Sequence, residues 1–120
     1  LVLLDIKQID PEKYERLTGK PLQPTLDFAE RLTRMGKKMW IRYVLVPGYT
    51  DDFDDVEKLA EFVTTLQGVE RVEVLPFHKM GEHKWQELGM PYELTDVPAP
   101  TPEVVERVRN QFRARGIFTC

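Results

Sequence analysis

Three short apolar runs, separated by stretches with helical periodicity, constrain the fold of this chain more than any other feature. The runs cover residues 1–6, 39–46 and 69–77 and are rich in Val, Leu and Ile. Runs of this length are typical of strands, whereas the segments between them place apolar residues three and four apart, as on one face of a helix. Strands that alternate with helices pair in parallel through right-handed crossovers. The sequence therefore predicts an α/β fold with three parallel strands and flanking helices.

Capping residues set the expected helix ends. Asp10, followed by proline, opens a short helix, because aspartate accepts hydrogen bonds from the first amide groups and proline suits the first helical position. We expect Thr25 to cap the second helix and Thr101 the last one, and the acidic residues 51–55 to begin the third. Residues 79–100 contain several prolines and little periodicity, which indicates a long connection.

Length, charge and cysteine content exclude several classes of protein. With 120 residues, the chain is expected to form a single domain over residues 1–120. Its net charge of −3 argues against a nucleic-acid binder, and no apolar run approaches the ~20 residues that span a membrane. The single cysteine, Cys120, cannot form an internal disulfide, which favours a cytoplasmic location. Because the chain begins inside a predicted strand and without Met, we expect it to be a piece of a longer protein.

Charged residues stand in or near the ends of the three predicted strands. Asp5 and Lys7 lie two apart, so they share one face of the first strand. Arg42 lies in the second strand, and His78 follows the third. In parallel α/β folds the carboxyl ends of the strands hold ligands. If these faces all point inward, the four groups predict a pocket for a ligand that carries both an amino and a carboxylate group.

Each of these residues also has a purely structural interpretation. Asp5 and Lys7 could form an ion pair that caps the strand, worth about 1 kcal/mol or less if exposed. Arg42 could pair with a helix carboxylate, and a lone histidine such as His78 is more often a satisfied loop residue. The two histidines and the single cysteine match no standard ligand spacing, so no metal site is expected in this chain.

The apolar character of the first strand on both faces predicts that both faces are buried. The helices of such a short chain cover only one face of the sheet, and we expect Val44, Val46, Val72 and Val74 to lie on the uncovered face. An exposed apolar face usually finds a partner. The chain by itself is therefore expected to self-associate, through its strand edges or through its open faces.

Three segments resemble a known enzyme family. They are Leu-Asp-Ile-Lys-Gln at residues 4–8, Trp-Ile-Arg-Tyr-Val-Leu-Val-Pro-Gly at residues 40–48 and Leu-Pro-Phe-His-Lys-Met-Gly at residues 75–81. In this order and spacing they are similar to the C-terminal half of the pyruvate formate-lyase activating enzymes, which are radical S-adenosylmethionine (SAM) proteins. The resemblance implies a partial (β/α)6 barrel of the TIM-like type, of which this chain supplies the C-terminal half.

The resemblance also implies roles for individual residues. The family's Asp-x-Lys motif, here Asp5, Ile6 and Lys7, holds the methionyl part of SAM, and a monovalent cation is expected beside Asp5. His78 is expected to contact the nucleoside part of SAM, and Arg42 to line the same pocket. The resemblance therefore implies that all five residues form a SAM site.

The cysteine motif of the family, C-x-x-x-C-x-x-C, does not occur in this sequence. Its thiolates hold a [4Fe-4S] cluster, so the cluster ligands are expected outside this chain and the chain alone is expected to be inactive. The resemblance implies that the parent enzyme is an oxidoreductase of anaerobic metabolism, which takes an electron from a flavodoxin or ferredoxin and generates a glycyl radical on pyruvate formate-lyase. Two alternatives stay open: an activase of a different glycyl radical enzyme, and a non-catalytic α/β module that binds a small anion.

Overall fold

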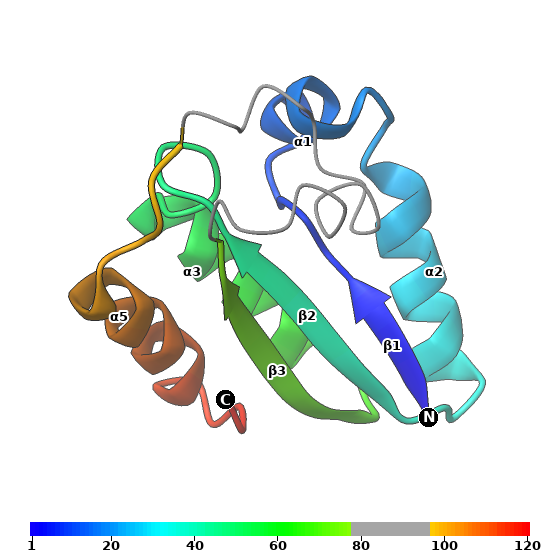
Figure 1. Cartoon of the computed structure of the whole chain (residues 1–120). Helices are drawn as coiled ribbons and strands as arrows, with labels where there is room; N and C mark the ends of the chain where they lie inside the picture. Colours follow the sequence, from blue (N-terminus) through cyan, green and yellow to red (C-terminus); the bar gives the residue numbers. More distant parts are fainter. Residues whose placement is uncertain (78–96) are drawn as a thin grey trace.

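The computed structural model describes residues 1–77 and 97–120. In chain order, its elements are β1 (Val2–Asp5), α1 (Pro11–Thr18), α2 (Gln23–Arg34), β2 (Met39–Leu45), α3 (Phe53–Thr64), β3 (Val69–Pro76) and α5 (Pro102–Arg113). The strands form one parallel sheet in the order β1-β2-β3 (Figure 1). None of the described helices is long and apolar enough to cross a membrane. The expected α/β class, with three parallel strands and flanking helices, is confirmed.

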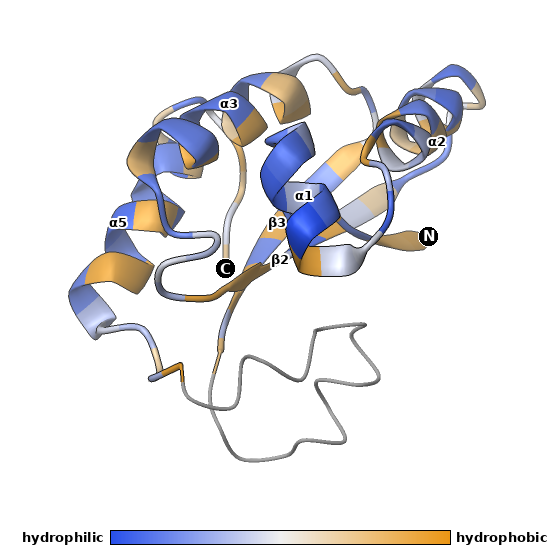
Figure 2. Cartoon of the chain, turned by 90° about the horizontal axis from the view of Figure 1, so that it is seen from above, coloured by the Kyte–Doolittle hydropathy of each residue, from blue (hydrophilic) through white to orange (hydrophobic). Residues whose placement is uncertain are grey.

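The main hydrophobic core lies between one face of the sheet and helices α2, α3 and α5 (Figure 2). β2 contributes Ile41, Tyr43 and Leu45 to this core, and all three side chains are fully buried. The ring of Tyr43 meets that of Phe112 in α5 edge to face, with 6.3 Å between their centroids. Burial of a large apolar side chain contributes about 1.5–3 kcal/mol. The helix-covered face is therefore the part of the sheet that chiefly stabilises the fold.

The opposite face of the sheet, called the open face below, is only partly covered by the described residues. Leu3 of β1 is 51% exposed, and Trp40 and Arg42 of β2 are half-buried. Near the carboxyl ends of the strands, a small second cluster covers this face. Its members are Leu17, Val44, Val46 and Phe77. The prediction that the first strand is buried on both faces is wrong, because only alternate residues of β1 point into the main core.

The phase of β3 also differs from the prediction. Val72 and Val74 lie in the main core, because they pair in register with Ile41 and Tyr43 of β2. Glu73, the charged residue between the two valines, therefore lies on the open face. Alternation along β3 defines two faces, but only its pairing with β2 decides which of them meets the helices.

The four valines expected to be exposed on the uncovered face are all buried. Val44 and Val46 do lie on the open face, but they pack against Leu17 of α1 and against Phe77. Val72 and Val74 belong to the other face. The prediction of self-association through open faces relied on these valines, and their positions give that part of it no support.

The C-terminal tail runs along the edge of β3. The Val72 amide donates to the Phe118 carbonyl at 2.9 Å, and the Cys120 amide donates to the Val72 carbonyl at 3.0 Å. Thr119 forms an isolated parallel bridge with Val72. The tail thus satisfies backbone groups that an unpaired edge strand would leave exposed.

Two of the three predicted helix caps are confirmed. The side chains of Asp10 and Thr101 accept hydrogen bonds from backbone amides in the first turns of α1 and α5. The expected cap at Thr25 is wrong, because α2 begins two residues earlier, at Gln23, and has no side-chain cap. Pro24 occupies the first turn of α2, where its fixed φ suits the helix and its missing N–H leaves no donor unsatisfied.

Candidate functional site

An ion pair joins β1 and β2 on the open face, at the carboxyl end of β1. Arg42 Nε donates to Asp5 Oδ1 at 2.6 Å, and Arg42 Nη2 donates to Asp5 Oδ2 at 3.0 Å, so the contact is bidentate. The side chains of Arg42 and Asp5 remain 31% and 30% exposed. The hydrogen bond to Asp5 raises the pKa of the Arg42 guanidinium above its ordinary value. The structure thus brings two predicted site residues together, and the partner of Asp5 is Arg42 and not Lys7.

A third charged residue extends this pair into a row across the sheet. Asp5 pairs in register with Arg42, and Arg42 pairs in register with Glu73. Residues in register on parallel strands point to the same face, with about 4.8 Å between neighbouring strands. Glu73 is half-buried and makes no hydrogen bond or ion pair with any residue in the described ranges. Asp5, Arg42 and Glu73 together are called the charge row.

The other predicted site residues are placed as follows. Ile6 is fully buried in the main core, so only its backbone can reach a ligand, and its amide donates to the Arg42 carbonyl at 3.2 Å. Lys7 is half-buried and forms no ion pair within the described part of the chain. His78 lies outside the described residues.

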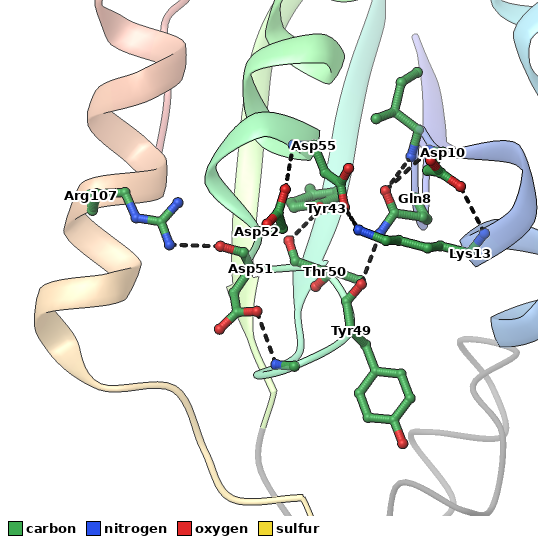
Figure 3. Close-up of polar contacts among 12 residues, drawn as sticks. Gln8, Asp10, Lys13, Tyr43, Tyr49, Thr50, Asp51, Asp52, Asp55 and Arg107 are labelled. Carbon is green, nitrogen blue, oxygen red and sulfur yellow. Dashed lines mark hydrogen bonds and ion pairs between the residues drawn. The ribbon is translucent and has the colours of Figure 1, made fainter.

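A buried amide links the two loops that follow β1 and β2. Gln8 Nε2 donates to the Tyr49 carbonyl at 2.8 Å, while Gln8 Oε1 accepts from the amides of Ile9 at 2.8 Å and Asp10 at 3.2 Å (Figure 3). The side chain of Gln8 is fully buried. A buried amide of this kind is retained only where partners satisfy its polar atoms. Gln8 therefore holds the start of α1 against the loop after β2.

Thr50 and Tyr43 fix the loop after β2. The Thr50 hydroxyl donates to the Val44 carbonyl at 2.8 Å and accepts from the Val46 amide at 2.7 Å. The Tyr43 hydroxyl donates to the Thr50 carbonyl at 2.5 Å (Figure 3). Burial raises the pKa of Tyr43 well above its ordinary value, so the phenol stays protonated and remains a donor. Three buried hydrogen bonds thus fix the loop, two to β2 and one to Val46, the residue directly after Leu45.

Two cations connect helices to this same loop and to α3. Lys13 Nζ of α1 donates to Asp55 Oδ2 at 2.6 Å, and this contact raises the pKa of the Lys13 ammonium group. Arg107 of α5 donates to the Asp51 carbonyl at 2.6 Å (Figure 3). These contacts join α1 to α3, and α5 to the loop after β2, at the carboxyl edge of the sheet. Sequence reasoning missed them, because they join residues far apart in the chain.

A cavity of about 220 Å³ lies between α1 and the loop after β2. Its lining includes Lys13, Arg16, Leu17, Gly48 and Tyr49. No member of the charge row lines it. The cavity is therefore distinct from the charge row.

The described residues do not fit an iron–sulfur cluster. Such a cluster is held by several thiolates, whereas the chain has only Cys120, which is exposed. No group of three or more His, Cys, Asp or Glu side chains within the described ranges could hold a metal ion.

The residues do fit the amino-acid part of a ligand such as SAM. A carboxylate, a guanidinium and an ammonium group are the kinds of partner that an α-amino and an α-carboxylate group require. Both oxygens of Asp5 accept from Arg42, at 2.6 and 3.0 Å. The Asp5 carboxylate is already paired with the Arg42 guanidinium, and the structure gives no support for the predicted monovalent-cation site.

Two solved structures share this fold. A domain of pyruvate-formate lyase-activating enzyme from Bacteroides vulgatus ATCC 8482 matches 99% of this chain, and 65% of its own length, with a TM-score of 0.81 and 20% identity. A radical SAM methyltransferase from Sphaerobacter thermophilus matches 98% of this chain, and 32% of its own length, with a TM-score of 0.74 and 20% identity. At this identity the likeness shows the fold alone. The chain therefore shares the α/β arrangement of part of each of these two proteins.

The sequence is similar to that of one group of curated enzymes. The chain is 52% identical over 116 residues, or 97% of its length, to pyruvate formate-lyase-activating enzymes of Staphylococcus aureus strains USA300 and N315. It spans 46% of these relatives, which is about half of their length. No family model matches the chain. The resemblance to pyruvate formate-lyase-activating enzymes that the three motifs indicate is confirmed.

Proposed function

We propose that this chain is part of a radical SAM activating enzyme that generates a glycyl radical on pyruvate formate-lyase, and that it supplies residues that orient SAM. The observation that carries the proposal is the meeting of Asp5 and Arg42 on the open face at the carboxyl end of β1, with Lys7 two residues after Asp5 in the chain. The 52% identity to the Staphylococcus aureus enzymes supports the same assignment.

Each site residue has a defined task in this proposal. Lys7 pairs with the carboxylate of SAM, and Asp5 accepts from its ammonium group or from a hydroxyl. Ile6 contributes through its backbone only, since its side chain lies in the main core. Arg42 holds the Asp5 carboxylate in place, and His78 contacts the nucleoside. These residues bind and orient, and none acts as an acid or a base.

SAM supplies the radical chemistry when it is bound. The described residues do not fit a [4Fe-4S] cluster, so its ligands lie elsewhere in the parent enzyme and the 120-residue chain alone is inactive. The parent is an oxidoreductase of the cytoplasm, and its electron donor is of the flavodoxin or ferredoxin type. The 46% coverage of the relatives leaves room for a cluster-binding part in the parent.

The test uses the polypeptide that the whole open reading frame encodes, purified without oxygen and loaded with iron and sulfide. Incubation with SAM, a chemical reductant and pyruvate formate-lyase should give the electron paramagnetic resonance signal of a glycyl radical and release 5′-deoxyadenosine. The 120-residue chain, treated in the same way, should release none above a protein-free control. A radical formed on another glycyl radical enzyme but not on pyruvate formate-lyase would change the partner. Absence of SAM binding would favour a small-anion-binding module instead.

A further inference from the structure

The backbone pairing between the first strand segment and β2 ends just before Lys7. The Ile6 amide donates to the Arg42 carbonyl at 3.2 Å. Within the described part of the chain, no backbone–backbone hydrogen bond joins residues 7–9 to another segment. Lys7 nevertheless stands between two residues whose side chains are fully buried, Ile6 and Gln8. Another contact therefore has to hold the chain beyond Ile6.

The side chain of Gln8 supplies that contact (Figure 3). Its Nε2 donates to the Tyr49 carbonyl at 2.8 Å, which ties residue 8 to the loop after β2. Its Oε1 accepts from the amides of Ile9 at 2.8 Å and Asp10 at 3.2 Å, which fixes the turn that leads into α1. Because the amide is fully buried, breaking any of these hydrogen bonds leaves a polar group without water. The backbone of Lys7 is thus held from both sides, by Ile6 and by Gln8.

The side chain of Lys7, in contrast, is not held by the described residues. It is half-buried and makes no hydrogen bond or ion pair with any of them. A lysine side chain has many rotamers, and it loses conformational freedom when its ammonium group binds a ligand. A fixed backbone reduces the freedom that remains to be lost on binding. The combination of a fixed backbone and an unpaired ammonium group is therefore typical of a preorganised binding residue.

We propose that Gln8 is a positioning residue, which holds the backbone of Lys7 so that the ammonium group meets the carboxylate of SAM. This inference rests on the proposed function for its ligand. The side chain of Gln8 is fully buried and its polar atoms are bound to the backbone, so it acts on the ligand only through Lys7. Replacement of Gln8 should therefore matter for SAM only where Lys7 is present.

The first arm of the test needs no ligand and uses the protein from the whole open reading frame. Gln8→Met keeps the length of the side chain but removes its donor and its acceptor. Hydrogen exchange, followed by mass spectrometry, should become faster in a peptide that covers residues 7–13, while residues 40–45 of β2 exchange as in the wild type. Unchanged exchange in the peptide over residues 7–13 would overturn the role of Gln8 in fixing this segment.

The second arm measures SAM affinity by anaerobic calorimetry. Gln8→Met should weaken binding about three- to tenfold, which is the range expected when one long side chain has to be ordered on binding. In a Lys7→Ala background, the same substitution should weaken binding by no more than about twofold. Equal weakening in both backgrounds would show a merely structural role and would overturn the proposal. Gln8→Asn, whose shorter amide cannot keep all three contacts, goes through the same cycle and decides the question if Gln8→Met does not fold.

A second buried glutamine provides the matched control. Gln111 of α5 donates through Nε2 to the Phe53 carbonyl at 3.1 Å and accepts through Oε1 from Arg107 at 2.7 Å. It lies between α3 and α5, away from the open face. Gln111→Met should lower the melting temperature as Gln8→Met does, yet change SAM affinity by no more than about twofold. A similar loss of affinity in both variants would attribute the effect to general destabilisation and would overturn the proposal.

The two arms separate the inference from the proposed function. Wild-type protein that fails to bind SAM would overturn the proposed function, whereas faster exchange over residues 7–13 in Gln8→Met would still support the role of Gln8 in fixing this segment. Wild-type protein that binds SAM, with unchanged affinity in Gln8→Met, would overturn the positioning role and leave the proposed function standing.

Discussion

The two faces of β2 carry opposite chemistry. Ile41, Tyr43 and Leu45 point into the main core and are fully buried, whereas Trp40 and Arg42 on the open face stay half-buried. Strand side chains alternate, so a single strand contributes to the core and to the charge row at the same time. The comparison teaches that the main core and the charge row are divided between the two faces of the sheet. Substitutions on the two faces should therefore have separate effects.

The largest expected effect comes from the helix-covered face. Ile41→Ala should lower the free energy of unfolding by about 2–5 kcal/mol, because it removes buried methyl groups and leaves a cavity. Denaturant titration followed by circular dichroism measures this loss. The matched control is Leu3→Ala on the open face, where the side chain is 51% exposed and the loss should stay within about 1 kcal/mol. Equal losses at the two positions would show that the helix-covered face does not contribute more to stability than the open face.

The next largest expected effect is a loss of SAM affinity when charged residues of the predicted site are replaced. Lys7→Ala should weaken SAM binding by about 1.5–3 kcal/mol through loss of a charge-assisted hydrogen bond, and Asp5→Asn should weaken it as well. Calorimetry on the protein from the whole open reading frame measures both. The free energy of unfolding of Lys7→Ala should change by no more than about 0.5 kcal/mol. Wild-type affinity in both variants would show that the open face is not the SAM site.

The control for these variants has to be a charge without partners. Glu57 is unsuitable, because its carboxylate accepts from Gln111 at 3.0 Å and from Arg115 at 2.8 Å. These two contacts lower the pKa of Glu57. Glu61 is exposed, and its side chain makes no contact of this kind among the described residues. Glu61→Gln should leave both affinity and stability unchanged.

A variant of Thr50 tests whether hydrogen bonds at the carboxyl edge of the sheet contribute to the free energy of unfolding as much as side chains of the core do. Thr50→Val keeps the volume of the side chain but leaves the buried Val46 amide and one acceptor site of the Val44 carbonyl without a partner. The expected loss is about 1–3 kcal/mol in the free energy of unfolding. Thr64→Val is the matched control, because its hydroxyl is exposed and donates only to the Glu61 carbonyl. A loss no larger than that of the control would mean that the Thr50 hydrogen bonds contribute little.

Local patterns were sufficient to predict the elements and the class of fold. Length and apolar content identify the three strands, and the caps at Asp10 and Thr101 follow from side-chain chemistry at the helix starts. The phase of β3 could not be predicted in this way. It depends on the register with β2, which contains an irregularity between Met39 and Trp40. A register shift of one residue exchanges the two faces of a strand.

The candidate site was predicted as a set of residues but not as a set of contacts. Asp5 and Arg42 were both identified, yet their bidentate pairing depends on strands whose sequences are far apart. Glu73 was missed, although a charge flanked by two valines indicates an open face. The burial of Gln8 could have been predicted as well. Gln8 continues the alternation of Leu4 and Ile6, whose side chains are expected to be buried. A polar residue in a buried phase must find partners, and those partners come from the next loop.

The smallest expected effect concerns Asp10, which lies on neither face of β2 and shows how much a single polar contact at the sheet edge contributes. Its carboxylate accepts from the Lys13 amide at 3.0 Å, and this hydrogen bond lowers the pKa of Asp10 below its ordinary value of 3.8. A lowered pKa in the folded state means that the contribution is complete above pH 3.8 and is lost as the pH falls through the folded value. Asp10→Asn keeps an N-cap acceptor, so at pH 7 it should change the free energy of unfolding by only a few tenths of a kcal/mol, whereas Asp10→Ala should cost about 1 kcal/mol. Unfolding titrations between pH 7 and pH 3 should show that wild-type protein loses more stability on acidification than Asp10→Asn does. Parallel pH profiles for the two proteins would contradict the assignment, because the titrating group would then lie elsewhere.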